Sequence, residues 1–175
     1  MKKPKHLLIE LPTADEIDQL AITSPKFEVR HLSFDMGDEK ADLDYTPCKG
    51  QVVLVIRSPA GIPLVKDRSG NDWALPSGRI DPNEDIGKSP KRVAREACGV
   101  DIRSAELAGV YDVVWHYSNV SIKRLHVVYA CLTDDTVCSL GDPEHIDDVR
   151  FFREVPSATA KHAIYSHAFA DCSTK

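Results

Sequence analysis

Residues 78–100, "GRIDPNEDIGKSPKRVAREACGV", decide the fold, because they join a loop to one short helix. Ser89 offers an N-cap and Pro90 suits the first helical position, so a helix is expected to begin here. Gly99 is a natural residue for the position after a helix C-terminus. The stretch therefore predicts a helix from Pro90 to about Cys98 that stops at Gly99.

Runs typical of β-strands lie on both sides of this helix. The predicted strands are 52–57, 62–66, a short extended piece at 73–76, 107–115, 125–132 and 149–152. A closing helix is predicted at 158–169. Strands before and after a central helix indicate a mixed α/β (α+β) sandwich and not a regular βαβ repeat.

Residues 1–45 have a different, mixed and acidic pattern. They predict a short helix near 14–20, a strand at 27–34 and a solvated linker at 35–44. A chain of 175 residues suits one domain with a terminal extension. We expect an extension over 1–45 and a single domain over 46–175.

Composition excludes several classes of partner. The net charge of −5 argues against a nucleic-acid surface, which is normally basic. The apolar runs are far shorter than the roughly 20 residues of a membrane helix. Five cysteines without a CxxC spacing are expected to be free and mostly buried thiols. The expected location is the cytoplasm, with no nucleic acid and no membrane as partner.

The stretch quoted above also carries a recognisable spacing. Gly78-x5-Glu84-x7-Arg92 followed by Glu96-x2-Gly99 matches five of the seven fixed letters of the Nudix box. The chain thus resembles the Nudix hydrolase superfamily, and "WALPSG" at 73–78 is similar to the tryptophan-x-x-proline-glycine-glycine segment of that family. The resemblance covers about residues 46–170 and implies the Nudix fold, a mixed β-sheet sandwiched between helices.

The box is degenerate in this register. The three acidic positions of the family fall at Val93, Glu96 and Ala97, so two of the three acids are absent. An alternative register takes Arg95-Glu96 as the Arg-Glu pair of the family, but it needs an insertion before the pair and a deletion after it. The first register keeps the full spacing and is preferred.

Positions 93, 96 and 97 share one helix face, where acids of the family would form an oxygen site for Mg²⁺. Here that face offers Glu96, to which Glu84 in the loop can add a second carboxylate. The competing interpretation is structural, because a lone glutamate close to two arginines is ordinarily half of a surface ion pair.

Segments near and after the box look like one branch, the GDP-mannose mannosyl hydrolases, which tolerate a depleted box. The similar segments are "GVYDVVWHYSN" at 109–119, "LHVVYACL" at 125–132, "DPEHIDDVRFF" at 142–152 and "KHAIYSHAF" at 161–169. The loop at 142–152 is the most telling, and the resemblance implies Glu144 as a metal ligand and His145 as the general base. The extra residue Ile146 departs from the pattern of the branch.

The resemblance further implies a complete site. Arg68 and Arg79 match arginines that hold the diphosphate, and Arg92 binds phosphate or braces the site. Tyr117 lies near the position of an adenine-stacking tyrosine, although one tyrosine in a β-rich stretch is more often a packing residue. The implied metal ligands are the Ser77 carbonyl, Glu84, Glu96 and Glu144, and the implied catalytic residues are His145 and Glu96.

The implied activity is the hydrolysis of a small nucleoside-diphosphate-linked compound, such as a GDP-sugar cut to GDP and free sugar, with Mg²⁺ or alternatively Mn²⁺. A homodimer is expected. Two alternatives stay open: a standard Nudix pyrophosphohydrolase, and a catalytically inactive nucleotide-binding or regulatory protein of this fold.

Overall fold

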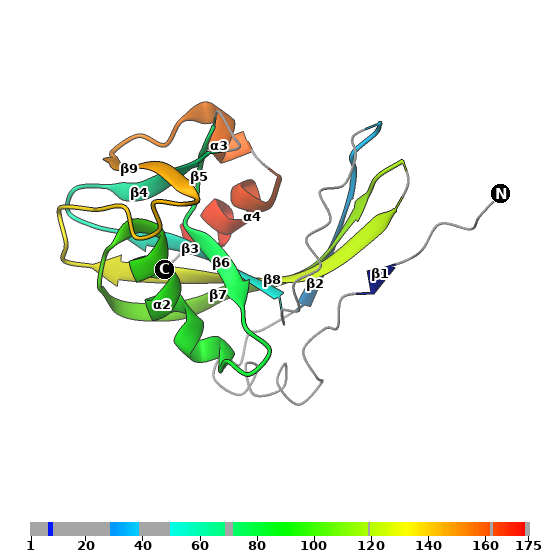
Figure 1. Cartoon of the computed structure of the whole chain (residues 1–175), viewed down its shortest axis with the longest axis horizontal. Helices are drawn as coiled ribbons and strands as arrows, with labels where there is room; N and C mark the ends of the chain where they lie inside the picture. Colours follow the sequence, from blue (N-terminus) through cyan, green and yellow to red (C-terminus); the bar gives the residue numbers. More distant parts are fainter. Residues whose placement is uncertain are drawn as a thin grey trace.

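A six-stranded mixed sheet forms the centre of the molecule in the computed structural model (Figure 1). The structure describes residues 7–8, 29–38, 50–68, 72–118, 120–161 and 163–173. The sheet order is β2-β7-β8-β3-β6, and β1 pairs with β8. The six strands are β1 (Leu7–Leu8), β2 (Val29–Asp35), β3 (Gly50–Arg57), β6 (Ser77–Ile80), β7 (Ile102–His116) and β8 (Ser121–Thr133).

The long antiparallel hairpin of β7 and β8 carries the other strands of this sheet. β3 runs parallel to β8, and β2 runs parallel to β7. β3 is almost entirely apolar, as expected for a central strand that is covered on both faces. β6 forms one end of the sheet and pairs antiparallel with β3.

A second, smaller antiparallel sheet has the order β5-β4-β9. Its strands are β4 (Ile62–Asp67), β5 (Trp73–Ala74) and β9 (Ile146–Phe152). Pro76 lies between β5 and β6, and its carbonyl accepts a hydrogen bond from the Leu54 amide at 2.9 Å. This bond ties the turn between the two sheets to the centre of β3.

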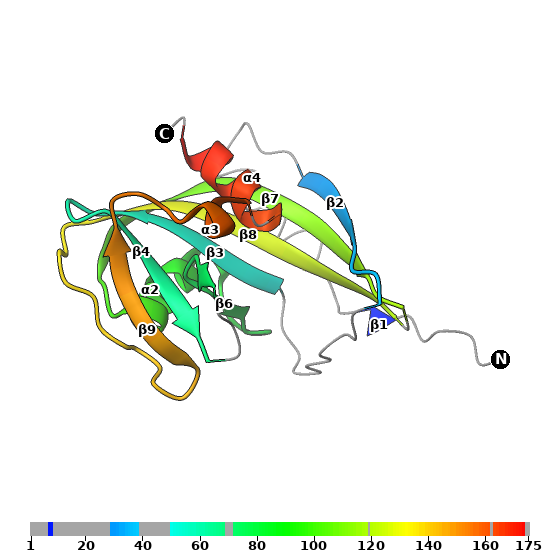
Figure 2. The same ribbon diagram turned by 90° about the horizontal axis from the view of Figure 1, so that it is seen from above.

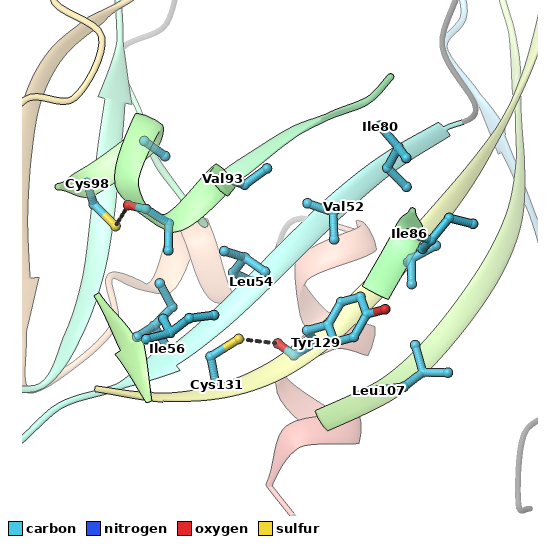
Figure 3. Close-up of a cluster of buried hydrophobic side chains, with 14 of the residues drawn as sticks. Val52, Leu54, Ile56, Ile80, Ile86, Val93, Cys98, Leu107, Tyr129 and Cys131 are labelled. Atoms are coloured by element: carbon cyan, nitrogen blue, oxygen red, sulfur yellow. Dashed lines mark hydrogen bonds between the residues drawn. The ribbon is translucent and has the colours of Figure 1, made fainter. Parts of the chain in front are cut away.

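Helices cover both faces of the main sheet (Figure 2). The helix α2 (Ser89–Cys98) packs on one face, in a core with Val52, Leu54 and Ile56 of β3 (Figure 3). The helix α4 (Ala163–Cys172), which follows α3 (Ser157–Lys161), packs on the other face against Val53 and Val55. The predicted sandwich of a mixed sheet between helices is therefore confirmed.

The helix predicted from Pro90 to Cys98 is α2, and Gly99 ends it in the left-handed conformation with φ +64°. Its start differs from the prediction. A short 3₁₀ turn, η1 (Ile86–Lys88), precedes α2, so Ser89 lies inside the helical segment and does not cap it. The buried Ser89 hydroxyl instead donates to the Ile86 carbonyl at 2.7 Å.

Most predicted strands are present with longer bounds, and one local expectation was wrong. Residues 78–80, expected as the start of a loop, belong to β6, because their backbone pairs with 50–52. The closing helix predicted at 158–169 is described as the two segments α3 and α4. The strand expected at 27–34 is β2, whereas the helix near 14–20 and the linker beyond residue 38 lie outside the described residues.

The cysteines of the described residues are free, as expected. Cys98, Cys131 and Cys172 are buried, and Cys138 is half-buried. Cys48 lies outside these residues. Within the same part of the chain, no helix combines the length and the apolar character that crossing a membrane requires.

Candidate functional site

Arg92 is the centre of the site that the sequence predicts on α2. Its Nε and Nη2 atoms donate to the two carboxylate oxygens of Glu84, each at 2.7 Å, and its Nη1 donates to Glu96 Oε2 at 2.7 Å. Nη2 also donates to the Arg79 carbonyl of β6 at 2.6 Å. These partners, the Glu84 hydrogen bonds foremost, raise the pKa of Arg92 above its ordinary value. One guanidinium thus joins the loop, the helix and the end strand of the sheet.

The loop before α2 holds Glu84 in place for this contact. The Glu84 amide donates to the Asp81 carbonyl at 3.0 Å, and its carboxylate accepts from the Asp81 amide at 3.2 Å. Asp85 caps η1 through the Gly87 amide at 2.9 Å. The Glu84 side chain is 15% exposed, whereas Glu96 on the outer face of the helix is 58% exposed.

Val93 and Ala97 point away from Glu96 and belong to the core. Both are buried, and Val93 lies above the sheet beside Val52 (Figure 3). A Cβ at Gly78 would stand 2.8 Å from Val93 Cγ2, so the absence of a side chain at residue 78 allows this packing. Residues 93, 96 and 97 therefore do not point to one place. Glu96 faces solvent, whereas Val93 and Ala97 face the sheet.

The loop that carries Glu144 and His145 crosses the C-terminal end of α2. The Ser139 amide donates to the Cys98 carbonyl at 3.0 Å. A Cβ at Gly141 would collide with the Glu96 carbonyl oxygen, so the loop backbone lies directly against the last turn of the helix. The two predicted parts of the site are therefore neighbours along this loop, although their side chains form separate clusters of contacts.

His145 forms a pair with Asp142. Its Nδ1 lies 2.8 Å from Asp142 Oδ2, and its side chain is 77% exposed. The hydrogen bond with His145 holds the pKa of Asp142 below its usual value. Asp142 also accepts from the Glu144 amide at 3.1 Å, which shapes the turn, and the Glu144 side chain is exposed. A carboxylate on one ring nitrogen is the arrangement that orients a histidine base.

Arg68 anchors the same turn. Its Nη2 donates to the Pro143 carbonyl at 2.8 Å, its Nε lies 3.2 Å from Asp147 Oδ1, and its amide donates to the His145 carbonyl at 3.2 Å. The residue expected to hold phosphate therefore lies with the His145 turn, where it links β4 to β9.

Ser77, Arg79 and Tyr117 lie away from the outer surface of α2. Ser77 and Arg79 pair with Val53 and Gln51, so their side chains face the α4 side of the sheet. Ser77 Oγ accepts from Gln51 Nε2 at 3.2 Å. Tyr117 is half-buried in the turn between β7 and β8, at the end of β7 opposite to the one that follows α2.

Several solved structures are similar in architecture to this chain. The pyrophosphohydrolase BsRppH of Bacillus subtilis, solved as a mutant, aligns with a TM-score of 0.59 over 78% of this chain and 88% of that chain, at 14% identity. The NUDIX domain of Shewanella oneidensis NrtR, solved with ADP ribose, aligns with a TM-score of 0.54 over 89% of this chain and 97% of that chain, at 19% sequence identity. The MutT NUDIX hydrolase of Burkholderia pseudomallei aligns with a TM-score of 0.53 over 69% of this chain and 95% of that chain, at 19% sequence identity.

The chain has the Nudix fold. No protein-family model matches the sequence, and no curated protein matches it. The fold predicted from the box is thus confirmed by three-dimensional likeness alone.

The residues that match fixed letters of the Nudix box have structural contacts. Gly78 gives room to Val93, Arg92 binds Glu84 and Glu96, and Gly99 ends the helix. The surface ion pair considered for Glu96 is present, with Arg92 as its partner. These matching residues are therefore accounted for by the architecture of the fold.

The described residues form no preassembled carboxylate cluster for a Mg²⁺ or Mn²⁺ ion. These ions prefer several oxygen ligands in octahedral geometry. In the described part of the chain, no three His, Cys, Asp or Glu side chains converge on a common point where they could hold a metal. Both Glu84 oxygens and one Glu96 oxygen already accept from Arg92. The guanidinium of Arg92 therefore supplies the positive charge beside the Glu84 and Glu96 carboxylates.

Sequence reasoning missed two groups beside the predicted residues. Asp142, three residues before His145, could have been found from that spacing, which suits a contact across a turn. Gln51 and Trp115 lie on the same face of the main sheet as the Arg79 side chain. Strand register decides which residues share this face, and no local pattern in the sequence reveals that register.

Proposed function

We propose that the protein binds a small nucleoside-diphosphate-linked compound with its Nudix fold and has lost the metal-dependent chemistry of the box. The observation that carries the proposal is the position of Arg92, whose guanidinium occupies the space between Glu84 and Glu96. Two further acids would have to stand at Val93 and Ala97, which are core residues. A charge at either position would be costly to bury.

The ligand class rests on likeness of fold and on guanidinium chemistry. The similar NUDIX domain of NrtR was solved with ADP ribose, and the similar BsRppH is a pyrophosphohydrolase. Guanidinium groups are suited to phosphate oxygens, which they bind with paired hydrogen bonds. Arg79, half-buried on the main sheet, is the residue that we assign to this contact. The probes are therefore ADP-ribose and GDP-mannose.

Calorimetric titration in EDTA tests the proposal directly. We expect ADP-ribose or GDP-mannose to bind without metal, and we expect no product after prolonged incubation with millimolar Mg²⁺ or Mn²⁺. Guanosine and adenosine serve as controls without phosphate and should bind more weakly. Metal-dependent turnover of either compound would overturn the proposal, and so would the absence of binding by both.

A hydrolase is the second candidate, favoured by the contact between His145 and Asp142. In that alternative His145 takes a proton from water, Glu144 adds a carboxylate beside it, and a GDP-sugar gives GDP and free sugar. Product analysis with GDP-mannose in ¹⁸O water separates the routes: label in the sugar supports C–O cleavage, and label in the phosphate supports a standard pyrophosphohydrolase. Equal rates for the protein and its His145→Gln variant would exclude His145 as the base.

The homodimer and the cytoplasmic location expected from the sequence stay predictions. Light scattering coupled to size exclusion measures the first, and fractionation of the source cells measures the second.

A further inference from the structure

The strand β2 is an end strand of the main sheet, with β7 as its neighbour (Figure 2). In the described part of the chain, no strand pairs with its other edge. Natural edge strands are usually protected by Pro, by Lys or by a bulge. The β2 sequence VRHLSFD has neither residue, and its seven consecutive pairs with β7 contain no bulge. The outer edge of β2 is therefore regular enough to pair with another strand.

The two faces of β2 differ in character. Leu32 and Phe34 are half-buried and pack on the apolar cluster on the α4 side of the main sheet. His31, Ser33 and Asp35 alternate with them, so they lie on the opposite face, where they are exposed. A strand that pairs with this edge must therefore match apolar side chains on one face and polar side chains on the other.

Contacts within the chain hold the polar row in place. His31 Nδ1 lies 3.1 Å from Asp112 Oδ2, and Asp35 Oδ1 accepts from the Gly37 amide at 2.9 Å. A histidine ring has a second nitrogen and a carboxylate has a second oxygen. The side chains of His31 and Asp35 can thus each bind one more group without giving up these contacts.

We infer that two copies of the chain associate by antiparallel pairing of their β2 edges, centred on Ser33. In a two-fold symmetric pair, each residue stands opposite the residue equally far beyond the centre. His31 then lies opposite the partner's Asp35, and Leu32 lies opposite the partner's Phe34. Symmetry repeats both contacts. Imidazole meets carboxylate on one face of the joined sheet and apolar side chains meet on the other, as stable cross-strand pairs require.

Other symmetric registers lack this match. Centring the pair on Leu32 would place Val29 opposite the partner's Asp35, an apolar side chain against a charge. Moving the centre two residues further along would place His31 opposite the partner's Gly37, which has no side chain to contact. Self-complementarity of both faces therefore selects one register of the edge.

This association goes beyond the proposed function, because it needs no ligand. It would join two six-stranded sheets into one continuous sheet. β6, which carries Arg79, is at the opposite end of the strand order from β2, and α2 packs on β3. Dimer formation and ligand binding can therefore be measured separately, and the failure of one leaves the other standing.

Disulfide cross-linking tests the register. Ser33 lies on the two-fold axis, where opposite Cα atoms are roughly 5 Å apart, a distance that a disulfide can span. Mild oxidation of Ser33→Cys should therefore give a covalent dimer on a non-reducing gel. Asp35→Cys is the matched control, because it is exposed on the same face but lies opposite His31 and far from its own copy. The unmodified protein controls for the native thiols.

The two cysteine variants give a clear decision. A covalent dimer from Ser33→Cys alone supports the central register. No cross-link in Ser33→Cys, or equal cross-linking of Asp35→Cys, would overturn the inference.

Sedimentation equilibrium of the full chain measures the association constant. Asp35→Lys removes the carboxylate opposite His31 at two symmetric positions and should weaken the dimer about tenfold or more. Asp38→Lys makes the same charge change at an exposed residue beyond the strand and should leave the constant unchanged. Equal weakening by both variants would contradict the β2 contact. An unmodified protein that stays monomeric at the highest concentration reached would refute the association itself.

Discussion

Arg92 donates two parallel hydrogen bonds to Glu84, from Nε to Oε1 and from Nη2 to Oε2, and both are 2.7 Å long. Their side chains are 31% and 15% exposed, so this pair is much less solvated than an ordinary surface pair. The contact spans eight residues and fixes the loop before α2 against the helix. In this chain the pair has the geometry of a structural bridge.

Replacing Arg92 should destabilise the fold. Arg92→Gln leaves the half-buried Glu84 carboxylate without its bidentate partner, and we expect a loss of about 2–3 kcal/mol in the free energy of unfolding. Urea denaturation measures this loss. The control is Arg95→Gln, which breaks an exposed pair with Asp101 and should cost below about 0.5 kcal/mol. Similar losses for both variants would contradict the bridging role.

An acid at position 93, where the box alignment expects one, should not create a metal site. Val93→Glu places a carboxylate in the core beside Val52 and against Gly78, and should cost about 3 kcal/mol or more. Urea unfolding measures the loss of stability, and calorimetric titration with Mg²⁺ shows whether the variant binds the metal. A Val93→Glu protein of normal stability that binds Mg²⁺ would show that residue 93 can face the outer side of the helix.

The buried thiols should be chemically inert in the folded state. Burial raises the pKa of Cys98 and of Cys131 to about 12, whereas Cys138 is half-buried. Because thiolates are the reactive species, alkylation at pH 8 should modify Cys138 before the two others. Mass spectrometry of partly modified protein gives the order. Fast labelling of Cys98 without unfolding would contradict its place in the core.

The same thiols make stability depend on pH at the alkaline side. Their folded pKa is raised above the unfolded value of about 8.5, so their contribution is complete below that unfolded value and is lost as the pH rises toward the folded one. Urea midpoints at pH 7 and pH 10 should therefore differ, with the lower midpoint at pH 10. A Cys98→Ala and Cys131→Ala double variant should show a smaller difference between the two values.

The contact between His145 and Asp142 should be visible in acid titration. The folded pKa of Asp142 is depressed, so the contact is present above the unfolded value of about 4 and is lost as the pH falls through the folded value. In His145→Gln the pKa of Asp142 should rise toward its ordinary value, as NMR titration of the carboxyl carbon would show. An unchanged Asp142 titration would mean that another group causes the shift.

Local signals in the sequence predicted the helix and most strands. Pro90 and Gly99 bracket α2, and the apolar run of β3 is typical of a covered strand. The strand β6 was missed because its four residues owe their conformation to pairing with β3, which lies outside the local window. The box spacing, in turn, predicted the fold that the solved structures confirm.

The predicted site depended on orientations that the sequence could not supply. A helical period places residues 93, 96 and 97 within one arc, but packing decides which part of that arc faces the sheet, and the core takes Val93 and Ala97. Arg68 was assigned to phosphate, yet its contacts are with the His145 turn. Assignment of the GDP-mannose branch stays a prediction that the labelled-water experiment tests.

The parallel pairing of β3 with β8 has a consequence for synthesis of the chain. Val52 pairs with Val127 and Ile56 with Cys131, so each contact spans about seventy-five residues. The apolar strand β3 emerges from the ribosome long before its partner, and non-local parallel pairing forms slowly. During that interval its unpaired edges and apolar side chains are open to association with other nascent chains.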